Sequence, residues 1–317
     1  MKKKILVLGA SGFIGRNTAE YFAQREEMEV YGTYFKSSPL SHPKIKMLHA
    51  DLTKKEEVDS VIKGMDVVIQ SAAITSGIKD VAAAPQMVIA DNAVMNSLIF
   101  RSAFDHSIPH VFTLSCTVMY HSSDLPLKET DFDANRDMYP SYFGVAWNKV
   151  YFEKMGEFYA SLGRNKYTTI RHSNVYGPYD KYDLERSHFF GATVTKVLTA
   201  TEDKLTMWGT GEEERDLLHV EDLIRFIELA IEKQETMSEL YNVGSGSSFP
   251  IKDLVSKIIE CSGKTMTVVH DMTKPSNKTK VSLNCDKAKT ELGWEPKLSL
   301  ESGIQKTIEW YRKNLLN

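Results

Sequence analysis

The chain has 317 residues, a net charge of −3 at pH 7, and 42% hydrophobic and 26% charged residues, which suits one large α/β domain with an added lobe. No apolar run reaches the about 20 residues of a membrane-spanning helix, and the only basic block is Lys2–Lys4, so neither a membrane nor a nucleic-acid partner is predicted. Cys116, Cys261 and Cys285 show no paired spacing, which predicts neither a disulfide nor a metal site and favours a cytoplasmic protein.

The first half of the chain alternates apolar runs with helical periods, the pattern of a parallel sheet wrapped by helices. The predicted strands cover residues 4–10, 29–34, 46–51, 66–73, 110–116 and 167–173, and the predicted helices cover Gly15–Arg25, Lys54–Lys63, Met87–Asp105 and Tyr142–Leu162. The sequence therefore predicts an α/β fold with a doubly wound parallel sheet.

The alternation of apolar runs and helical periods ends near residue 175, where a polar and aromatic stretch begins. We expect a helix, a short strand at "KLTMWG" and a final amphipathic helix ending in "TIEWYRKNLLN". The predicted organisation is a nucleotide-binding domain over 1–174, with a return segment at about 215–245. A smaller C-terminal α/β lobe over 175–214 and 246–317 binds the substrate.

The stretch "VLGASGFIGRN" places Gly9, Gly12 and Gly15 after the first strand and at the opening of the first helix. Glycines in this setting allow a tight turn and a close backbone approach to a pyrophosphate, which the helix N-terminus then faces. The context predicts a Rossmann-type dinucleotide site formed by these glycines with Ser11, Phe13 and Ile14.

The second strand lacks the acidic residue that usually binds the adenosine ribose diol. Residues 33–38 read "TYFKSS", and a lysine with two hydroxyls suits a 2′-phosphate, so NADP is favoured over NAD. Lys36 is the predicted phosphate ligand, unless it is an ordinary surface lysine. Asp51 and Leu52 follow the third strand, where they either border the adenine or begin the next helix.

With these residues in order, the chain resembles the extended short-chain dehydrogenases/reductases, the NAD(P)-dependent epimerase/dehydratase group, over essentially its whole length. The resemblance includes Ala72 after the fourth strand, Asn92 in the following helix, Lys149, and the segments "RHSNVYGP" and "RDLLHVEDL". It implies that Ala72, Asn92 and Lys149 contact the dinucleotide, Lys149 at the nicotinamide ribose.

Within this group the second half is most similar to the GDP-fucose synthases, which epimerise and reduce a GDP-4-keto-6-deoxy sugar. The similarity rests on "NVYGPYDKYDLERSHFFGA", "MWGTGEEERDLLHVEDL" and "DMTKPSNKTK". It implies substrate contacts from Asn174 and His188, and diphosphate contacts from Trp208, Arg215 and Lys274. Trp208 as a core residue, and Arg215 paired within "EEERD", are the alternatives.

The active-site tyrosine of the family is missing. Four residues before Lys149, where the family has that tyrosine, stands Val145. The catalytic Ser/Thr position, counted back from Tyr120, holds Cys116. A one-residue shift would instead match Cys116 to the catalytic cysteine of the GDP-fucose synthases. A thiol can serve as an acid/base group, but Cys116 is equally interpretable as a small buried side chain.

Two further residues are candidates for the missing acid/base. Tyr142 precedes Val145 by three residues, and a helix starting at Pro140–Ser141 would let its ring lean inward. His188 matches the catalytic histidine of the resembling family and titrates near neutrality. His172 and His219 are interpreted as core residues.

The sequence thus predicts an NAD(P)-dependent enzyme with chemistry at C4 of a GDP-hexose or GDP-heptose, serving glycan or capsule biosynthesis. The alternative is a catalytically impaired regulatory protein that binds NAD(P) and the sugar nucleotide. Family members commonly dimerise through two helices of each subunit. Trp147, Tyr151 and Phe158 would suit such a homodimer interface. The same pattern is equally consistent with a helix face that packs on the core.

Overall fold

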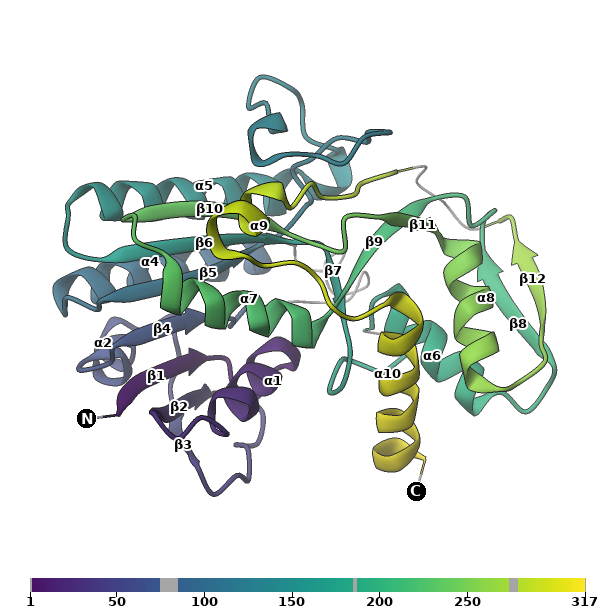
Figure 1. Ribbon diagram of the computed structural model, residues 1–317, viewed down its shortest axis with the longest axis horizontal. Helices are drawn as coiled ribbons and strands as arrows, with labels where there is room; N and C mark the ends of the chain where they lie inside the picture. Colours follow the sequence, from purple (N-terminus) through teal and green to yellow (C-terminus); the bar gives the residue numbers. More distant parts are fainter. Residues whose placement is uncertain (1, 75–84, 185–186, 274–278, 317) are drawn as a thin grey trace.

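The computed structural model describes residues 2–74, 85–184, 187–273 and 279–316, so the predicted ligand Lys274 lies outside the described residues. Figure 1 shows a larger body around the main sheet and a smaller body that carries the C-terminal helix.

The larger body is built on a seven-stranded sheet in the order β10-β6-β5-β4-β1-β2-β3, with every neighbouring pair parallel. The strands are β1 (Lys3–Leu8), β2 (Met28–Tyr34), β3 (Ile45–His49), β4 (Val67–Gln70), β5 (His110–Ser115), β6 (Lys166–His172) and β10 (Ser238–Val243). The strand β10 comes from the predicted return segment and pairs with β6 at the sheet edge.

Helices cover both faces of this sheet because alternate strand residues are apolar on both sides. In β1, Ile5 and Val7 enter one core, and Leu6 and Leu8 enter the other. The helices are α1 (Phe13–Phe22), α7 (Val220–Lys233) and α9 (Asp286–Leu292) on the first face, and α2 (Lys55–Ile62), α4 (Pro85–Asp105) and α5 (Phe143–Ser161) on the second.

The smaller body packs helices against two short sheets. Its elements are β7 (Asn174–Tyr176), α6 (Phe189–Thr199), β8 (Lys204–Trp208), β9 (Glu214–His219), β11 (Ser248–Pro250), α8 (Ile251–Ser262), β12 (Thr267–Asp271) and α10 (Leu300–Leu315). The strands pair as β11-β9-β7 and as β12-β8. A separate apolar cluster, which includes Val194, Leu254 and Ile304, holds the helices together.

The predicted α/β class with its parallel sheet is confirmed, and the predicted strands and helices of the first half fall within a few residues of those observed. The start of α5 differs. Pro140–Tyr142 forms a 3₁₀ turn, closed by a 2.8 Å bond from the N–H of Tyr142 to the carbonyl O of Tyr139. The helix begins only at Phe143, so Tyr142 lies just outside it. No helix among the described residues is long and apolar enough to cross a membrane.

Candidate functional site

The strand order reverses between β1 and β4, because β1 leads to β2 on one side while β4 and β5 lie on the other. Open α/β sheets bind ligands at the carboxyl ends of the strands beside such a reversal. The residues that follow these strand ends here are the glycine loop after β1, Ala72 after β4 and Cys116 after β5.

The glycine loop has no room for a side chain at Gly9 or Gly15. Gly9 has a φ of +77°, and a Cβ on it would lie 2.7 Å from the Cα of Ala72. A Cβ on Gly15 would lie 2.2 Å from the carbonyl O of Gly9. The N–H of Gly9 also donates to the hydroxyl of Thr33 at 2.8 Å. This bare backbone at the start of α1 fits a pyrophosphate, as the sequence predicts for Gly9, Ser11, Gly12, Phe13, Ile14 and Gly15.

The loop after β2 meets the glycine loop. The hydroxyl of Ser37 donates to the hydroxyl of Ser11 at 2.7 Å, and Lys36 is exposed next to it. Asp51 accepts from the N–H and hydroxyl of Thr53, whose bonds hold the pKa of Asp51 below its usual range. Asp51 is therefore engaged in the turn before α2. Leu52 is buried.

Asn92 holds the chain that leaves β4. Its side-chain Oδ1 accepts from the N–H of Ile74 and its Nδ2 donates to the carbonyl O of Ile74, both at 3.0 Å. The predicted cofactor role of Asn92 stays a prediction, and in the structure its amide shapes the loop beside Ala72.

Lys149 reaches from α5 to the end of β5, with its Nζ 2.7 Å from the carbonyl O of Leu114. Val145 lies one helical turn earlier and is half-buried. Burial raises the pKa of the nearby Cys116 thiol, and the positive charge of Lys149 opposes that rise. Cys116 therefore carries its proton at neutral pH, so it can donate a proton but is a poor thiolate.

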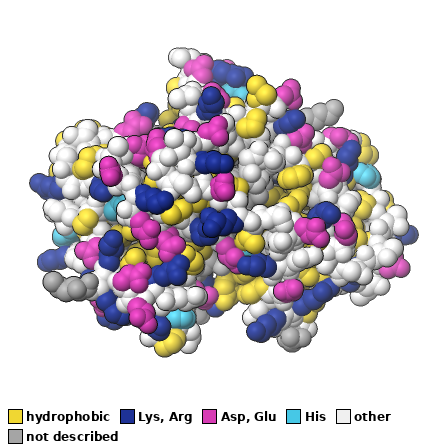
Figure 2. Space-filling model, in the orientation of Figure 1, with side chains coloured by type: hydrophobic (Ala, Val, Ile, Leu, Met, Phe, Trp, Pro, Cys, Tyr) yellow, Lys and Arg dark blue, Asp and Glu magenta, His cyan; other side chains and the backbone are white. Residues whose placement is uncertain are grey.

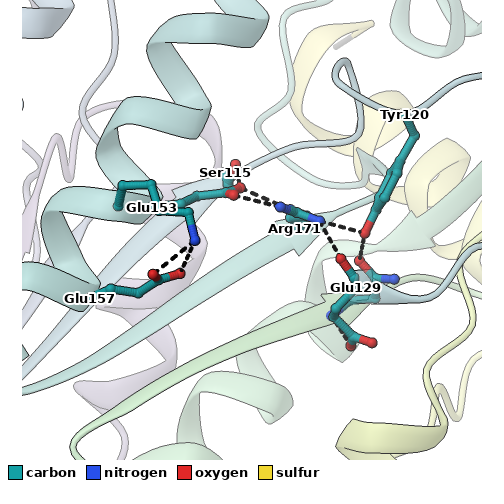
Figure 3. A network of polar contacts seen from close by, with 8 residues as sticks. Ser115, Tyr120, Glu129, Glu153, Glu157 and Arg171 are labelled. Atoms are coloured by element: carbon teal, nitrogen blue, oxygen red, sulfur yellow. Dashed lines mark hydrogen bonds and ion pairs between the residues drawn. The ribbon is translucent and has the colours of Figure 1, made fainter. Parts of the chain in front are cut away.

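A buried polar network fixes the segment that carries Cys116 (Figure 3). Glu153, one turn after Lys149 on α5, accepts two bonds from the guanidinium of Arg171, at 2.9 and 2.6 Å. Glu153 also accepts from the hydroxyl of Ser115 at 2.6 Å, and Arg171 donates to the phenol of Tyr120 at 2.8 Å. Both sides of the Cys116 segment are thus bonded to one ion pair that is 3% exposed on each side chain.

The other two acid/base candidates lie at the surface. Tyr142 is 38% exposed in its 3₁₀ turn. His188 is the exposed N-cap residue of α6. The protein around its ring and the positive charge of Lys181 lower the pKa of His188, so it is neutral near pH 7.

The sequence interpretation missed His172. It is the last residue of β6 and half-buried, not a core residue, and its charge interacts with those of Lys149 and His188. The signal was present, because a histidine at the carboxyl end of a central parallel strand points to the ligand-binding edge. His219, by contrast, is buried as expected, although its Nε2 has no partner there.

The predicted substrate ligands of the smaller body lie on its short strands. Trp208 is 52% exposed at the end of β8, so its interpretation as a core residue is wrong. Arg215 in β9 donates to the carbonyl O of Glu214 and to the hydroxyl of Thr279, at 2.8 and 2.9 Å. Within "EEERD" it therefore bonds to the backbone of Glu214, and it forms no ion pair with a carboxylate in the described part of the chain. Asn174 is exposed on β7 and donates to the carbonyl O of Asp216.

Comparisons with known proteins agree with this geometry. The model of the NAD dependent epimerase/dehydratase family matches residues 5–244. The chain is 29% identical to a GDP-L-fucose synthase of Azorhizobium caulinodans, over 98% of this chain and 96% of that protein. It is also 29% identical to a GDP-L-colitose synthase of Yersinia pseudotuberculosis, over 97% of each.

Solved structures show the same fold. The UDP-glucose 4-epimerase of Thermotoga maritima, determined with UDP-glucose, superimposes with a TM-score of 0.87 at 25% identity, covering 98% of this chain and 99% of that one. The predicted family and the predicted class, an NAD(P)-dependent enzyme of nucleotide-linked sugars, are thereby confirmed.

Proposed function

Because the chain belongs to the NAD dependent epimerase/dehydratase family, we propose that it oxidises or reduces C4 of a GDP-linked hexose or heptose. The observation that carries the proposal is the glycine loop, in which Gly9 and Gly15 leave no room for a Cβ, together with end-to-end similarity to GDP-L-fucose and GDP-L-colitose synthases. A role in the cytoplasmic supply of sugars for glycans or capsules follows from that substrate class.

NADP is the proposed dinucleotide. When bound, the dinucleotide supplies or accepts hydride. The loop Gly9–Gly15 would hold its pyrophosphate, and Lys149 its nicotinamide ribose. Lys36 and Ser37 after β2, with Ser11 of the glycine loop, offer an ammonium and two hydroxyls, and no acidic residue directly after β2 repels a 2′-phosphate.

The smaller body would hold the GDP moiety. Nη1 of Arg215 donates to three acceptors, the carbonyl O of Glu214 and the carbonyl O and hydroxyl of Thr279. The other nitrogens of its planar guanidinium would bind phosphate oxygens. The exposed indole of Trp208 offers a flat apolar face at the end of β8. Asn174, His188 and Lys274 are kept as further substrate ligands from the resemblance.

Cys116, His188, Tyr142 and Lys149 are the proposed catalytic group of the sequence interpretation. In the structure, Lys149 and Cys116 lie at the carboxyl end of β5, and Tyr142 and His188 are exposed. A protonated Cys116 would donate its proton to a sugar carbon next to the ketone.

A homodimer is also proposed. Tyr151 and Phe158 lie seven residues apart on α5, which puts them on one helical face, and they are 52% and 59% exposed. Val94 on the neighbouring α4 is 45% exposed. Trp147 instead packs into a small cluster with Met119 and Met138.

The function is tested by absorbance at 340 nm with NADPH or NADH and GDP-4-keto-6-deoxymannose. The reverse reaction is tested with NADP⁺ and GDP-hexoses or GDP-heptoses, and UDP-glucose is the matched control. We expect absorbance changes with GDP-linked sugars only, faster with the NADP form. Deuterium uptake at C3 or C5 would mark epimerisation. Tight binding of both ligands without any hydride transfer would instead support the regulatory alternative.

A further inference from the structure

His172 lies beside the two side chains that the family resemblance assigns to chemistry. Parallel pairing sets Ser115 beside Arg171, so the residues that follow them, Cys116 and His172, leave the ends of neighbouring strands, whose backbones lie about 5 Å apart. Lys149 reaches the same edge, because its Nζ bonds the carbonyl O of Leu114. The histidine therefore stands at the carboxyl edge of the sheet and not in its interior.

The hydrogen bond of the ring fixes its tautomer. Nδ1 of His172 lies 2.8 Å from the carbonyl O of Ser173. A carbonyl can only accept, so Nδ1 carries the proton and the lone pair of the neutral ring is on Nε2. Within the described part of the chain Nε2 has no hydrogen-bond partner, and unlike Nε2 of His219 it is not sealed from solvent.

The surroundings keep this ring neutral. Burial lowers the pKa of His172 to about 4 against the bond to Ser173, and the positive charge of Lys149 on α5, with that of His188 before α6 when it is protonated, acts in the same direction as burial. The neighbouring Cys116 is a neutral thiol. At neutral pH the ring therefore presents an open proton acceptor.

We propose that His172 is the general base that takes the place of the tyrosine missing at Val145. This role rests on the proposed function. In the oxidative direction His172 takes the proton of the C4 hydroxyl on Nε2 while the C4–H bond breaks and its hydride leaves for oxidised NAD(P). A C4 ketone, an imidazolium and the reduced dinucleotide result. The nearby positive charge of Lys149 favours release of the new proton to solvent.

Two variants separate the roles of the two ring nitrogens. His172→Asn keeps an N–H donor close to the position of Nδ1 and removes Nε2, whereas His172→Gln places an amide near Nε2 without its basicity. We expect either variant to lower kcat for oxidation at pH 7 by about 100-fold or more, the usual contribution of a general base. The Kd values for NADP⁺ and GDP should change less than twofold.

His106→Gln is the matched control. His106 follows α4 at the opposite edge of the sheet, with Nε2 3.6 Å from Asp59, and its loss should leave kcat within twofold. If His172→Asn and His172→Gln both keep kcat within threefold of the wild type, the proposal is wrong. A wild type that binds NADP⁺ and GDP but transfers no hydride overturns the proposed function and this role with it.

A second readout needs neither ligand. The Cε1–H NMR signal of His172, assigned by its absence in His172→Asn, should titrate below pH 5 in the unliganded protein. A titration midpoint near 6.5 would overturn the inference. The kcat for oxidation should likewise be flat from pH 6 to 8 in the wild type.

Discussion

At the residue scale, the chemistry of this protein depends on which groups hold their protons. Burial raises the pKa of Cys116 and lowers that of His172 to about 4, so both are uncharged at neutral pH. Cys116 can donate a proton and His172 can accept one, and the two residues lie at neighbouring strand ends. Val145 contributes neither, and we propose that Cys116 and His172 together supply the proton transfers of the tyrosine that the family resemblance leads one to expect.

The buried His110 predicts a pH-dependent contribution to stability. Burial lowers the pKa of His110 to about 3, so between that value and about 6.5 the unfolded chain binds more protons than the folded one. Its contribution to stability is full above pH 6.5 and is lost as the pH falls. Between pH 6.5 and 5 this loss is about 2 kcal/mol, at about 1.4 kcal/mol per pH unit.

Asp180 acts in the opposite direction, because burial raises its pKa to about 7, so the test compares two proteins. Urea unfolding of the wild type and of His110→Gln at pH 6.5 and 5 should show the wild type losing about 2 kcal/mol more. Equal losses in both proteins would contradict a neutral, buried His110.

At the scale of elements, the end of β5, the helix α5 and β6 act as one unit. The ion pair between Glu153 and Arg171 joins α5 to β6, and its bonds to Ser115 and Tyr120 hold the Cys116 segment from both sides (Figure 3). Burial raises the pKa of Tyr120 to about 12, so its phenol can accept from Arg171 and donate to Asn242 at 2.9 Å. These bonds place Lys149 and Cys116 relative to each other.

Glu153→Gln tests this unit. Removing one charge leaves Arg171 buried and unpaired, which should lower the free energy of unfolding by about 3 kcal/mol or more. Glu157→Gln on the same helix is the control, because Glu157 and its partner Lys154 are 48% and 65% exposed. It should cost less than about 1 kcal/mol in the same urea titration. Similar costs for the two variants would show that the buried network does not stabilise the fold.

At the scale of the whole molecule, one chain forms a larger body around the parallel sheet and a smaller body that carries the C-terminal helix (Figure 1). On the face drawn in Figure 2, acidic and basic side chains are interspersed over both bodies. That distribution fits the net charge of −3 and gives a polyanion such as nucleic acid no continuous basic surface on this face.

The proposed homodimer gives a prediction at this scale. Phe158→Glu introduces a charge on the exposed face of α5 and should convert a dimer of about twice the chain mass into a monomer, measured by sedimentation equilibrium. Leu125→Glu is the control, since Leu125 is 74% exposed and belongs to the loop after β5 instead of α4 or α5. Dimers that persist in Phe158→Glu would place the interface elsewhere.

The sequence predicted the parallel sheet and the glycine loop because both depend on local patterns. The period of apolar residues identified the strands, and the position of Gly9 and Gly15 between a strand and a helix identified the loop. Contacts between residues that are distant in the sequence could not be predicted from these patterns. The bonds that tie Ser115 and Arg171 to Glu153, and the placement of His172 beside Lys149, arise only when β5, β6 and α5 meet. The 3₁₀ turn that moves Tyr142 out of α5 depends on one backbone bond.

The measurement that tests the central claim most directly is single-turnover hydride transfer at 340 nm in the wild type and in Val145→Tyr. Enzyme in excess over GDP-4-keto-6-deoxymannose would be mixed with NADPH, after the binding of each ligand has been shown. We predict that the wild type transfers hydride and that the restored tyrosine raises its rate no more than a few-fold. A flat trace in the wild type with transfer in Val145→Tyr would contradict the account and identify a binding protein that lost its catalytic residue.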